Sequence, residues 1–181
     1  MTELYSAKMK HSSDTLKRFT VLQYDTFEPL GKLLRFALAV VLIIVGAASG
    51  SSALLVFLLF AGCVLLTNLN FKAASVADQV ERALGGKFPT LDYSFSDSGF
   101  TDGEGREEVA YSSLIRLIED KDYLYLFVSK ASGYMVEIAS VTGDGGAEGL
   151  KRLLSEKSGC NWTSPVTLLN LRLKDLFGNR K

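Results

Sequence analysis

The chain has 181 residues, with 20 Lys and Arg against 20 Asp and Glu, one His and two Cys. This length fits about one ordinary domain, or a small domain with an additional segment. Two Cys exclude a disulfide scaffold, and one His with two Cys is too few for a usual zinc site. We therefore expect no metal site and no cofactor, and the single His leaves little room for acid–base catalysis.

Residues 1–32 are predicted as an N-terminal cytoplasmic segment with a strand and a helix. The letters ELYSAKM alternate apolar and polar residues, which is typical of a strand. The stretch that follows fits a helix with Ser13 or Asp14 as its N-cap, or a strand over Phe19 to Phe27. We favour the helix.

An uncharged run from Phe36 to Phe71 is the strongest feature of the sequence. One helix of that length would measure about 54 Å at ~1.5 Å per residue, whereas a bilayer core is about 30 Å thick. Small residues interrupt the run at 46–52. We therefore predict a transmembrane helical hairpin over 33–69, with helices at 33–48 and 53–69. A signal peptide and a buried hairpin of a soluble protein are the weaker alternatives.

Basic residues flank the run on both sides, and the turn within it carries no charge. The positive-inside rule then predicts a multi-pass protein of the bacterial inner membrane, with two spans and both termini cytoplasmic. The lipid bilayer is thus an expected partner. The candidate membrane-interface residues are Lys32, Arg35, Lys72, Trp162, Arg172 and Lys174.

Gly46 and Gly50 form a G-x-x-x-G pattern at the middle of the run. They are candidate helix-packing residues, and such a face could also form a homo-oligomer. The favoured interpretation is that a tight turn needs small, flexible residues there.

The remaining segments are predicted from their periodicity. Residues 70–87 are expected to hold a juxtamembrane helix that starts with a capping box at Ser75 and Asp78 and stops at Gly85. Residues 88–160 alternate with period two and predict a cytoplasmic antiparallel sheet of five or six strands, with YLYLFV central, followed by a helix. Residues 161–181 are an amphipathic tail that lies on the membrane or packs on the sheet. The predicted fold class is α+β.

Charge is unevenly distributed along the chain. Residues 1–87 hold 9 basic and 6 acidic residues, residues 88–160 hold 7 and 13, and residues 161–181 hold 4 and 1. An acidic sheet domain argues against nucleic-acid binding and suits a basic protein partner. Arg106 is outnumbered by acidic residues in the first loops, SDSG and DGEGREE, which argues against polyphosphoinositide binding there. The candidate partner-binding acidic loops carry Asp97, Asp102, Glu104, Glu107 and Glu108.

The segment Leu91 to Phe127 resembles the YcxB-like family of small bacterial membrane proteins. The residues that carry the resemblance are Gly99, Phe100, Tyr111, Leu114, Ile115, Tyr123 and Tyr125. The resemblance implies two central membrane helices and a pleckstrin-homology-like sheet capped by a helix. It brings no catalytic residue.

These observations together predict a non-enzymatic inner-membrane protein whose cytoplasmic domain binds or regulates a protein partner of unknown identity. An immunity or accessory protein, which neutralises a toxin or serves one membrane complex, is an alternative. A lipid- or ligand-binding module is a second alternative.

Overall fold

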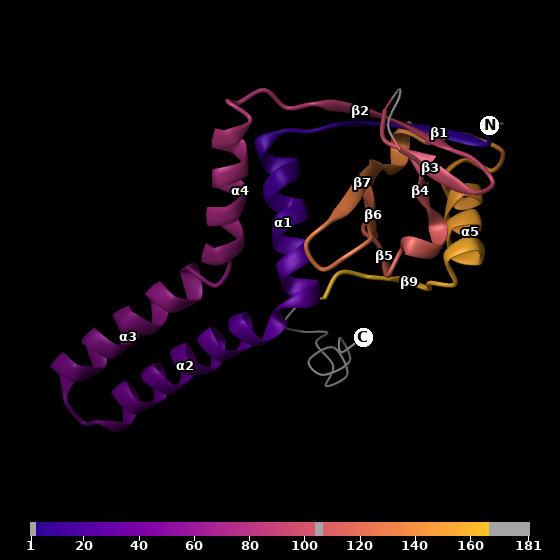
Figure 1. Cartoon of the computed structure of the whole chain (residues 1–181). Helices are drawn as coiled ribbons and strands as arrows, with labels where there is room; N and C mark the ends of the chain where they lie inside the picture. Colours follow the sequence, from indigo (N-terminus) through magenta and orange to yellow (C-terminus); the bar gives the residue numbers. More distant parts are fainter. Residues whose placement is uncertain (1–2, 104–106, 167–181) are drawn as a thin grey trace. The chain divides into compact units, whose positions relative to one another are not determined.

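A computed structural model describes residues 3–103 and 107–166 (Figure 1). The chain divides into two compact units, which we describe separately. Of the described residues, 3–19, 81–103 and 107–165 form the sheet unit, and 20–80 together with Val166 form the helical unit. The described elements form a mixed α+β fold with five α-helices and two mainly antiparallel sheets.

The first sheet of the sheet unit has the strand order β4-β3-β2-β1-β8. The N-terminal strand β1 pairs antiparallel with β2 from Tyr5 opposite Phe95 to Lys10 opposite Thr90. The strand predicted from ELYSAKM is therefore confirmed, and it is an inner strand of this sheet. The strands are β1 (Tyr5–Lys10), β2 (Thr90–Phe95), β3 (Gly99–Thr101), β4 (Val109–Ala110) and β8 (Thr142–Gly143).

The second sheet has the order β7-β6-β5-β9. Its strands are β5 (Arg116–Glu119), β6 (Tyr123–Phe127), β7 (Gly133–Glu137) and β9 (Trp162–Thr163). The prediction of one antiparallel meander within 88–160 is thus incomplete, because β1 and β9 come from outside this segment and the strands form two sheets, with β9 parallel to β5. The central position predicted for YLYLF is confirmed, since β6 pairs on both sides and is fully buried from Leu124 to Phe127.

Aromatic rings fill the core of the sheet unit. Phe100 lies 5.5 Å from Phe95, 5.0 Å from Tyr134 and 6.3 Å from Tyr111, measured between ring centroids. These separations are typical of attractive aromatic pairs. Two of the residues on which the family resemblance rests, Phe100 and Tyr111, are therefore core residues.

Helix α5 (Gly146–Ser158) packs on the sheets through Leu150 and Leu154, both fully buried. It ends at Gly159, whose positive φ of 69° is a conformation that glycine adopts at little cost. At Gly149 an added Cβ would lie 2.1 Å from the Asp144 carbonyl oxygen, so only glycine fits there. The helix predicted after the strands is confirmed.

Helix α1 (Ser13–Phe27) begins in the sheet unit and settles the choice between helix and strand. Its cap is Ser12 rather than the predicted Ser13 or Asp14. The Ser12 hydroxyl accepts from the Thr15 N–H at 3.2 Å, and the Thr15 hydroxyl accepts from the Ser12 N–H at 2.8 Å. This reciprocal pair satisfies two backbone donors at once, which explains the shift by one or two residues.

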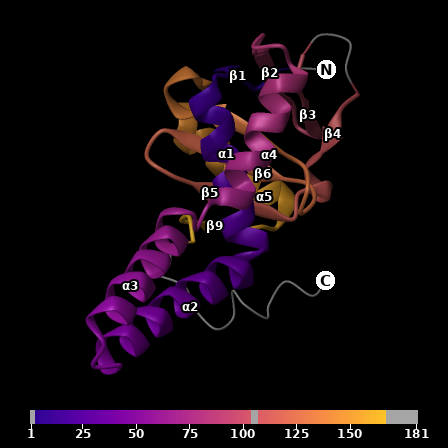
Figure 2. The ribbon, with the colours of Figure 1, turned by 90° about the vertical axis from the view of Figure 1, so that its left-hand side faces the viewer.

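In the helical unit, α2 (Pro29–Ala48) and α3 (Ser52–Thr67) lie side by side in both views (Figure 2). Helix α2 starts four residues before the predicted boundary because Pro29 is well placed in a first helical turn. Gly50 has a φ of 66° and open space around it, as a turn residue does. A Cβ on Gly46 would lie 3.1 Å from Leu58 Cβ, so this glycine is a close-packing position.

The length and composition of α2 suit a membrane span. It has 20 residues, and only 11% of its apolar window is buried. Helix α3 has 16 residues and reaches a comparable length only together with α4 (Phe71–Ala83), across a 46° bend. Within residues 3–103 and 107–166, one helix is therefore long and apolar enough by itself to cross a membrane, which weakly suggests an association with membranes.

Helix α4 corrects the predicted capping box. It begins at Phe71, four residues before Ser75, so Ser75 and Asp78 lie inside the helix. The Phe71 N–H donates to the Asn68 carbonyl at 3.1 Å, which starts the helix directly after the turn that follows α3. The predicted stop at Gly85 is confirmed by its φ of 59°.

Candidate functional site

A cavity of about 190 Å³ lies in the helical unit where α1 ends, α2 begins and α3 gives way to α4. We call it the charged cavity. Breaks in the helices create it, one at Glu28 before Pro29 and one at 68–70. The side chains that supply its chemistry are Tyr24, Asp25, Glu28, Lys32, Arg35 and Lys72.

Two ion pairs cross the charged cavity. Lys32 Nζ lies 2.7 and 2.9 Å from the two carboxylate oxygens of Asp25, and both side chains are less than one-fifth exposed. Lys72 Nζ donates to Glu28 and also lies 4.9 Å from the centroid of the Tyr24 ring. The hydrogen bond to Glu28 raises the pKa of Lys72, so this amine keeps its positive charge at neutral pH.

Arg35 differs from the two lysines. Its Nη1 donates to the Leu69 carbonyl oxygen at 3.4 Å, which is a long hydrogen bond. Among residues 3–103 and 107–166, no carboxylate lies within ion-pair distance of this guanidinium. The cavity is thus lined by three cations and two carboxylates and carries one net positive charge. Its chemistry suits an anion with several oxygen acceptors.

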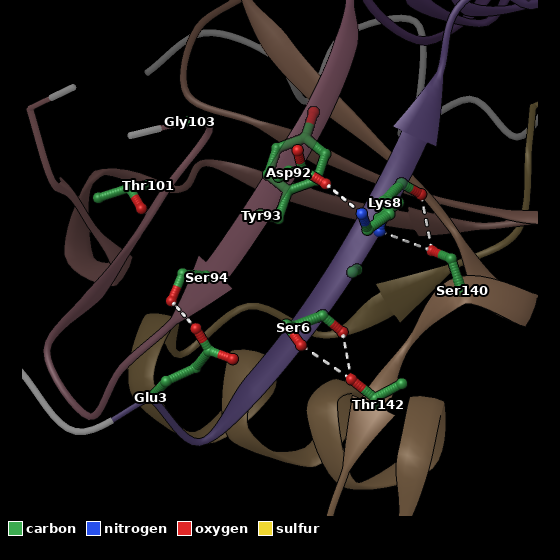
Figure 3. Close-up of a pocket in the computed structure, with 11 residues that line it drawn as sticks. Glu3, Ser6, Lys8, Asp92, Tyr93, Ser94, Thr101, Gly103, Ser140 and Thr142 are labelled. Carbon is green, nitrogen blue, oxygen red and sulfur yellow. Dashed lines mark hydrogen bonds and ion pairs between the residues drawn. The ribbon is translucent and has the colours of Figure 1, made fainter. Parts of the chain in front are cut away.

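A second hollow, of about 640 Å³, lies on the sheet unit over β1 and β2 (Figure 3). We call it the sheet groove. Lys8 Nζ pairs with Asp92 at 3.2 Å, and the hydroxyls of Ser6 and Thr142 lie 2.8 Å apart. The remaining polar groups come from Glu3, Ser94, Thr101 and Ser140. The groove therefore presents hydroxyl groups and charges of both signs, which can form hydrogen bonds and ion pairs with the polar groups of a bound peptide.

The predicted acidic loop residues do not form one free patch. Asp97 pairs with Lys157 at 2.6 Å, while Glu108 Oε1 accepts from the hydroxyls of Ser96 at 2.9 Å and Ser98 at 2.8 Å. Both carboxylates therefore hold local structure. Glu107 is exposed, Asp102 is half-buried beside the groove-lining Thr101 and Gly103, and Glu104 lies outside the described residues.

Three predicted membrane-interface residues come together, because Lys32, Arg35 and Lys72 all line the charged cavity. Trp162 instead belongs to β9 of the sheet unit, where its Nε1 donates to the Lys151 carbonyl oxygen at 2.9 Å. Arg172 and Lys174 lie outside the described residues.

Sequence reasoning missed the carboxylates of the charged cavity. The Lys32–Asp25 pair spans the break between two helices, and Glu28 and Lys72 are 44 positions apart. No helical spacing rule covers either pair. A search for acidic residues near the ends of the apolar run would have found both Asp25 and Glu28.

A third cluster joins α1 to the β5–β6 turn within the sheet unit. Arg18 pairs with Asp120 and Asp122, both at 3.0 Å, and lies 4.9 Å from the centroid of the Tyr123 ring. The Tyr125 hydroxyl donates to Asp120 at 2.7 Å. Burial alone would raise the pKa of Asp120, but the hydrogen bonds it accepts and the charge of Arg18 hold it below its usual value.

The described residues contain no group of three or more His, Cys, Asp and Glu side chains placed to hold a metal ion.

No curated protein and no solved structure matches the chain. The pleckstrin-homology-like fold therefore stays a prediction. The family model described as YcxB-like protein matches residues 95–152, which run from the end of β2 into α5. The resemblance to the YcxB-like family is thus shown for this segment of the sheet unit.

Proposed function

We propose that the chain is an integral protein of the bacterial inner membrane and that its sheet unit binds a protein partner on the cytoplasmic side. In this proposal α2 and α3 form a two-span hairpin, and both termini are cytoplasmic. The sheet unit acts by binding and not by catalysis.

The single observation that carries the membrane part is the exposure of large apolar side chains on both helices. Leu34, Ile44, Val56, Phe57 and Phe60 are each at least 60% exposed. A surface of this kind is unfavourable in water and favourable in lipid. The two helices pack against each other through Gly46 of α2 and Gly62 of α3. This contact leaves the large apolar side chains on the outer faces uncovered.

The charge pattern supports the proposed orientation. The turn at 49–51 carries no charge, whereas Lys32, Arg35 and Lys72 lie at the opposite ends of the helices. Basic residues remain on the cytoplasmic side during insertion. The sheet unit follows α4 in the chain and would lie on that side.

The sheet groove supports a binding role. It is open, and polar side chains surround a largely apolar floor; Lys8 pairs with Asp92, and Glu3 accepts a hydrogen bond from Ser94. Glu3 and Asp92 outnumber Lys8 in its lining, and Asp102 stands beside it. A basic segment of a partner is the complementary chemistry.

Site-specific photo-crosslinking in living cells tests this function. A photoreactive phenylalanine derivative in place of Thr101 lies in the sheet groove, and the same residue in place of Glu156 lies on the exposed surface of α5. We expect a membrane-fraction adduct of one defined mass from position 101 and none from position 156. Equal adducts from both positions, or none from position 101, would contradict the binding role of the groove.

A further inference from the structure

The charged cavity has the properties of a binding site for a phosphate group. It is built from side chains of three helices, and its volume of about 190 Å³ is several times the ~30 Å³ share of one water in the liquid. Three cations converge on it from positions 32, 35 and 72. The charged cavity therefore has the volume and the positive charge to hold one tetrahedral anion.

Arg35 is the group best placed to bind such an anion. The guanidinium presents five N–H donors in a planar fork, a geometry that matches two phosphate oxygens. Among the described residues, its one hydrogen bond is the long bond to the Leu69 carbonyl, and it has no ion pair. The two lysines, in contrast, already donate to Asp25 and Glu28. An incoming phosphate would therefore complete the bonding of Arg35 without breaking an ion pair.

The position of the cavity along α2 indicates where the phosphate comes from. Arg35 is directly followed by the uncharged segment Phe36–Ala48, which measures about 20 Å at ~1.5 Å per residue. In a bilayer with a core of about 30 Å, a helix this short holds its last charged residue at the headgroup level or slightly below. A charge at that depth is stabilised by lipid phosphates.

We propose that the charged cavity binds the headgroup phosphate of an anionic phospholipid, with Arg35 as the principal ligand. The lipid would hold together the ends of α1, α2 and α4. This inference rests on the proposed membrane insertion of α2.

Native mass spectrometry of the delipidated full-length protein in detergent tests the proposal. The probes are phosphatidylglycerol and, separately, inorganic phosphate. Arg35→Gln removes the guanidinium, and Arg82→Gln makes the same change of charge at an exposed site on α4 that does not line the cavity. We expect phosphatidylglycerol to bind about tenfold more weakly to R35Q and unchanged to R82Q, since a charge-assisted hydrogen bond is lost.

A second variant keeps the test decisive if R35Q folds poorly. Arg35→Lys keeps the positive charge but lacks the planar fork of N–H donors, so we expect it to bind phosphatidylglycerol with an affinity between those of wild type and R35Q. Far-ultraviolet circular dichroism verifies the helix content of each variant. Equal binding of phosphatidylglycerol to wild type, R35Q and R35K would overturn the proposal. Arg35-dependent binding of inorganic phosphate without binding of the lipid would overturn the lipid as the source.

Carbonate extraction of membranes separates the two levels of inference. If the wild-type chain resists extraction but shows no Arg35-dependent lipid binding, the lipid site is wrong and the membrane proposal stands. If the wild-type chain is extracted, the proposed membrane function is itself wrong.

Discussion

Asp120 is a single residue on which the geometry of several neighbours depends. It accepts hydrogen bonds from the backbone N–H groups of Asp122 and Tyr123, both at 2.9 Å, from the Tyr125 hydroxyl and from Arg18. The side chain is 14% exposed, so these bonds are shielded from water. The ionised carboxylate thus holds the β5–β6 turn and the first half of α1 in place.

The lowered pKa of Asp120 predicts a stability that depends on pH. A carboxyl group with a depressed folded-state pKa stabilises above its unfolded pKa of about 3.9, and this contribution disappears as pH falls through the folded pKa. We expect Asp120→Asn to cost about 1–3 kcal/mol at pH 7 and to reduce the acid-induced loss of stability below pH ~4. Denaturant unfolding followed by Trp162 fluorescence measures both effects.

Asp122→Asn is the matched control for this prediction. Asp122 also pairs with Arg18, but its side chain is 48% exposed. Such a pair contributes about 0–1 kcal/mol, so D122N should stay close to wild type. Equal acid profiles for wild type and D120N would show that Asp120 does not control the turn.

At the scale of the elements, the contact between α2 and α3 depends on Gly62. A Cβ there would lie 2.8 Å from Ile43 Cγ1 and 3.1 Å from the Ala39 carbonyl oxygen, and Ala39 is fully buried. Neither neighbour is the free end of a long side chain. The two helices therefore approach each other so closely at position 62 that only glycine, whose side chain is a hydrogen atom, fits there.

We predict that Gly62→Ala lowers the stability of the detergent-solubilised protein by about 1–3 kcal/mol, because the added methyl overpacks this contact. Gly31→Ala is the control, since an added Cβ at Gly31 meets nothing within 4 Å. An alanine there should be neutral or stabilise α2 by about 0.5–1 kcal/mol. Thermal unfolding followed by circular dichroism measures both variants. A G62A variant as stable as G31A would exclude the close contact.

Sequence patterns predicted the elements better than their pairing. The length of the apolar segments and the spacing of apolar residues predicted helices α2, α3 and α5, because these signals depend only on residues close together in the sequence. The partners of β1 and β9 could not be read from the sequence, since Tyr5 pairs with Phe95 and Leu117 with Trp162 through long-range backbone bonds.

The charged cavity was predicted only in part, for a related reason. The basic half of the charged cavity was visible as charges that flank an apolar run, whereas its acidic half depends on where two helices break. Gly62 was missed because it lies in the middle of an apolar segment, where a small residue gives no turn signal. The role of Glu108 was hidden in the same way, because its partners Ser96 and Ser98 lie in another turn.

At the scale of the whole molecule, the apolar segments are short for a bilayer. Segment Phe36–Ala48 gives about 20 Å and the 16 residues of α3 about 24 Å, against a core of about 30 Å. We therefore predict a higher thermal stability in bilayers of 14-carbon lipids than in bilayers of 20-carbon lipids, because hydrophobic mismatch costs free energy for each ångström. Calorimetry in nanodiscs of the two lipids measures this difference. Equal stability in both would contradict a hairpin whose apolar length matches the thinner bilayer.

The two-span membrane topology is the central claim, and cysteine labelling tests it most directly. Cys63 and Cys160 are first replaced by Ser, and a single Cys is then introduced at Ser52, beside the turn between α2 and α3, or at Ser112, an exposed site of the sheet unit. A membrane-impermeant maleimide is added to intact spheroplasts. We predict labelling of S52C without lysis, and labelling of S112C only after lysis. Labelling of both before lysis, or of neither until lysis, would contradict the topology on which the proposed function depends.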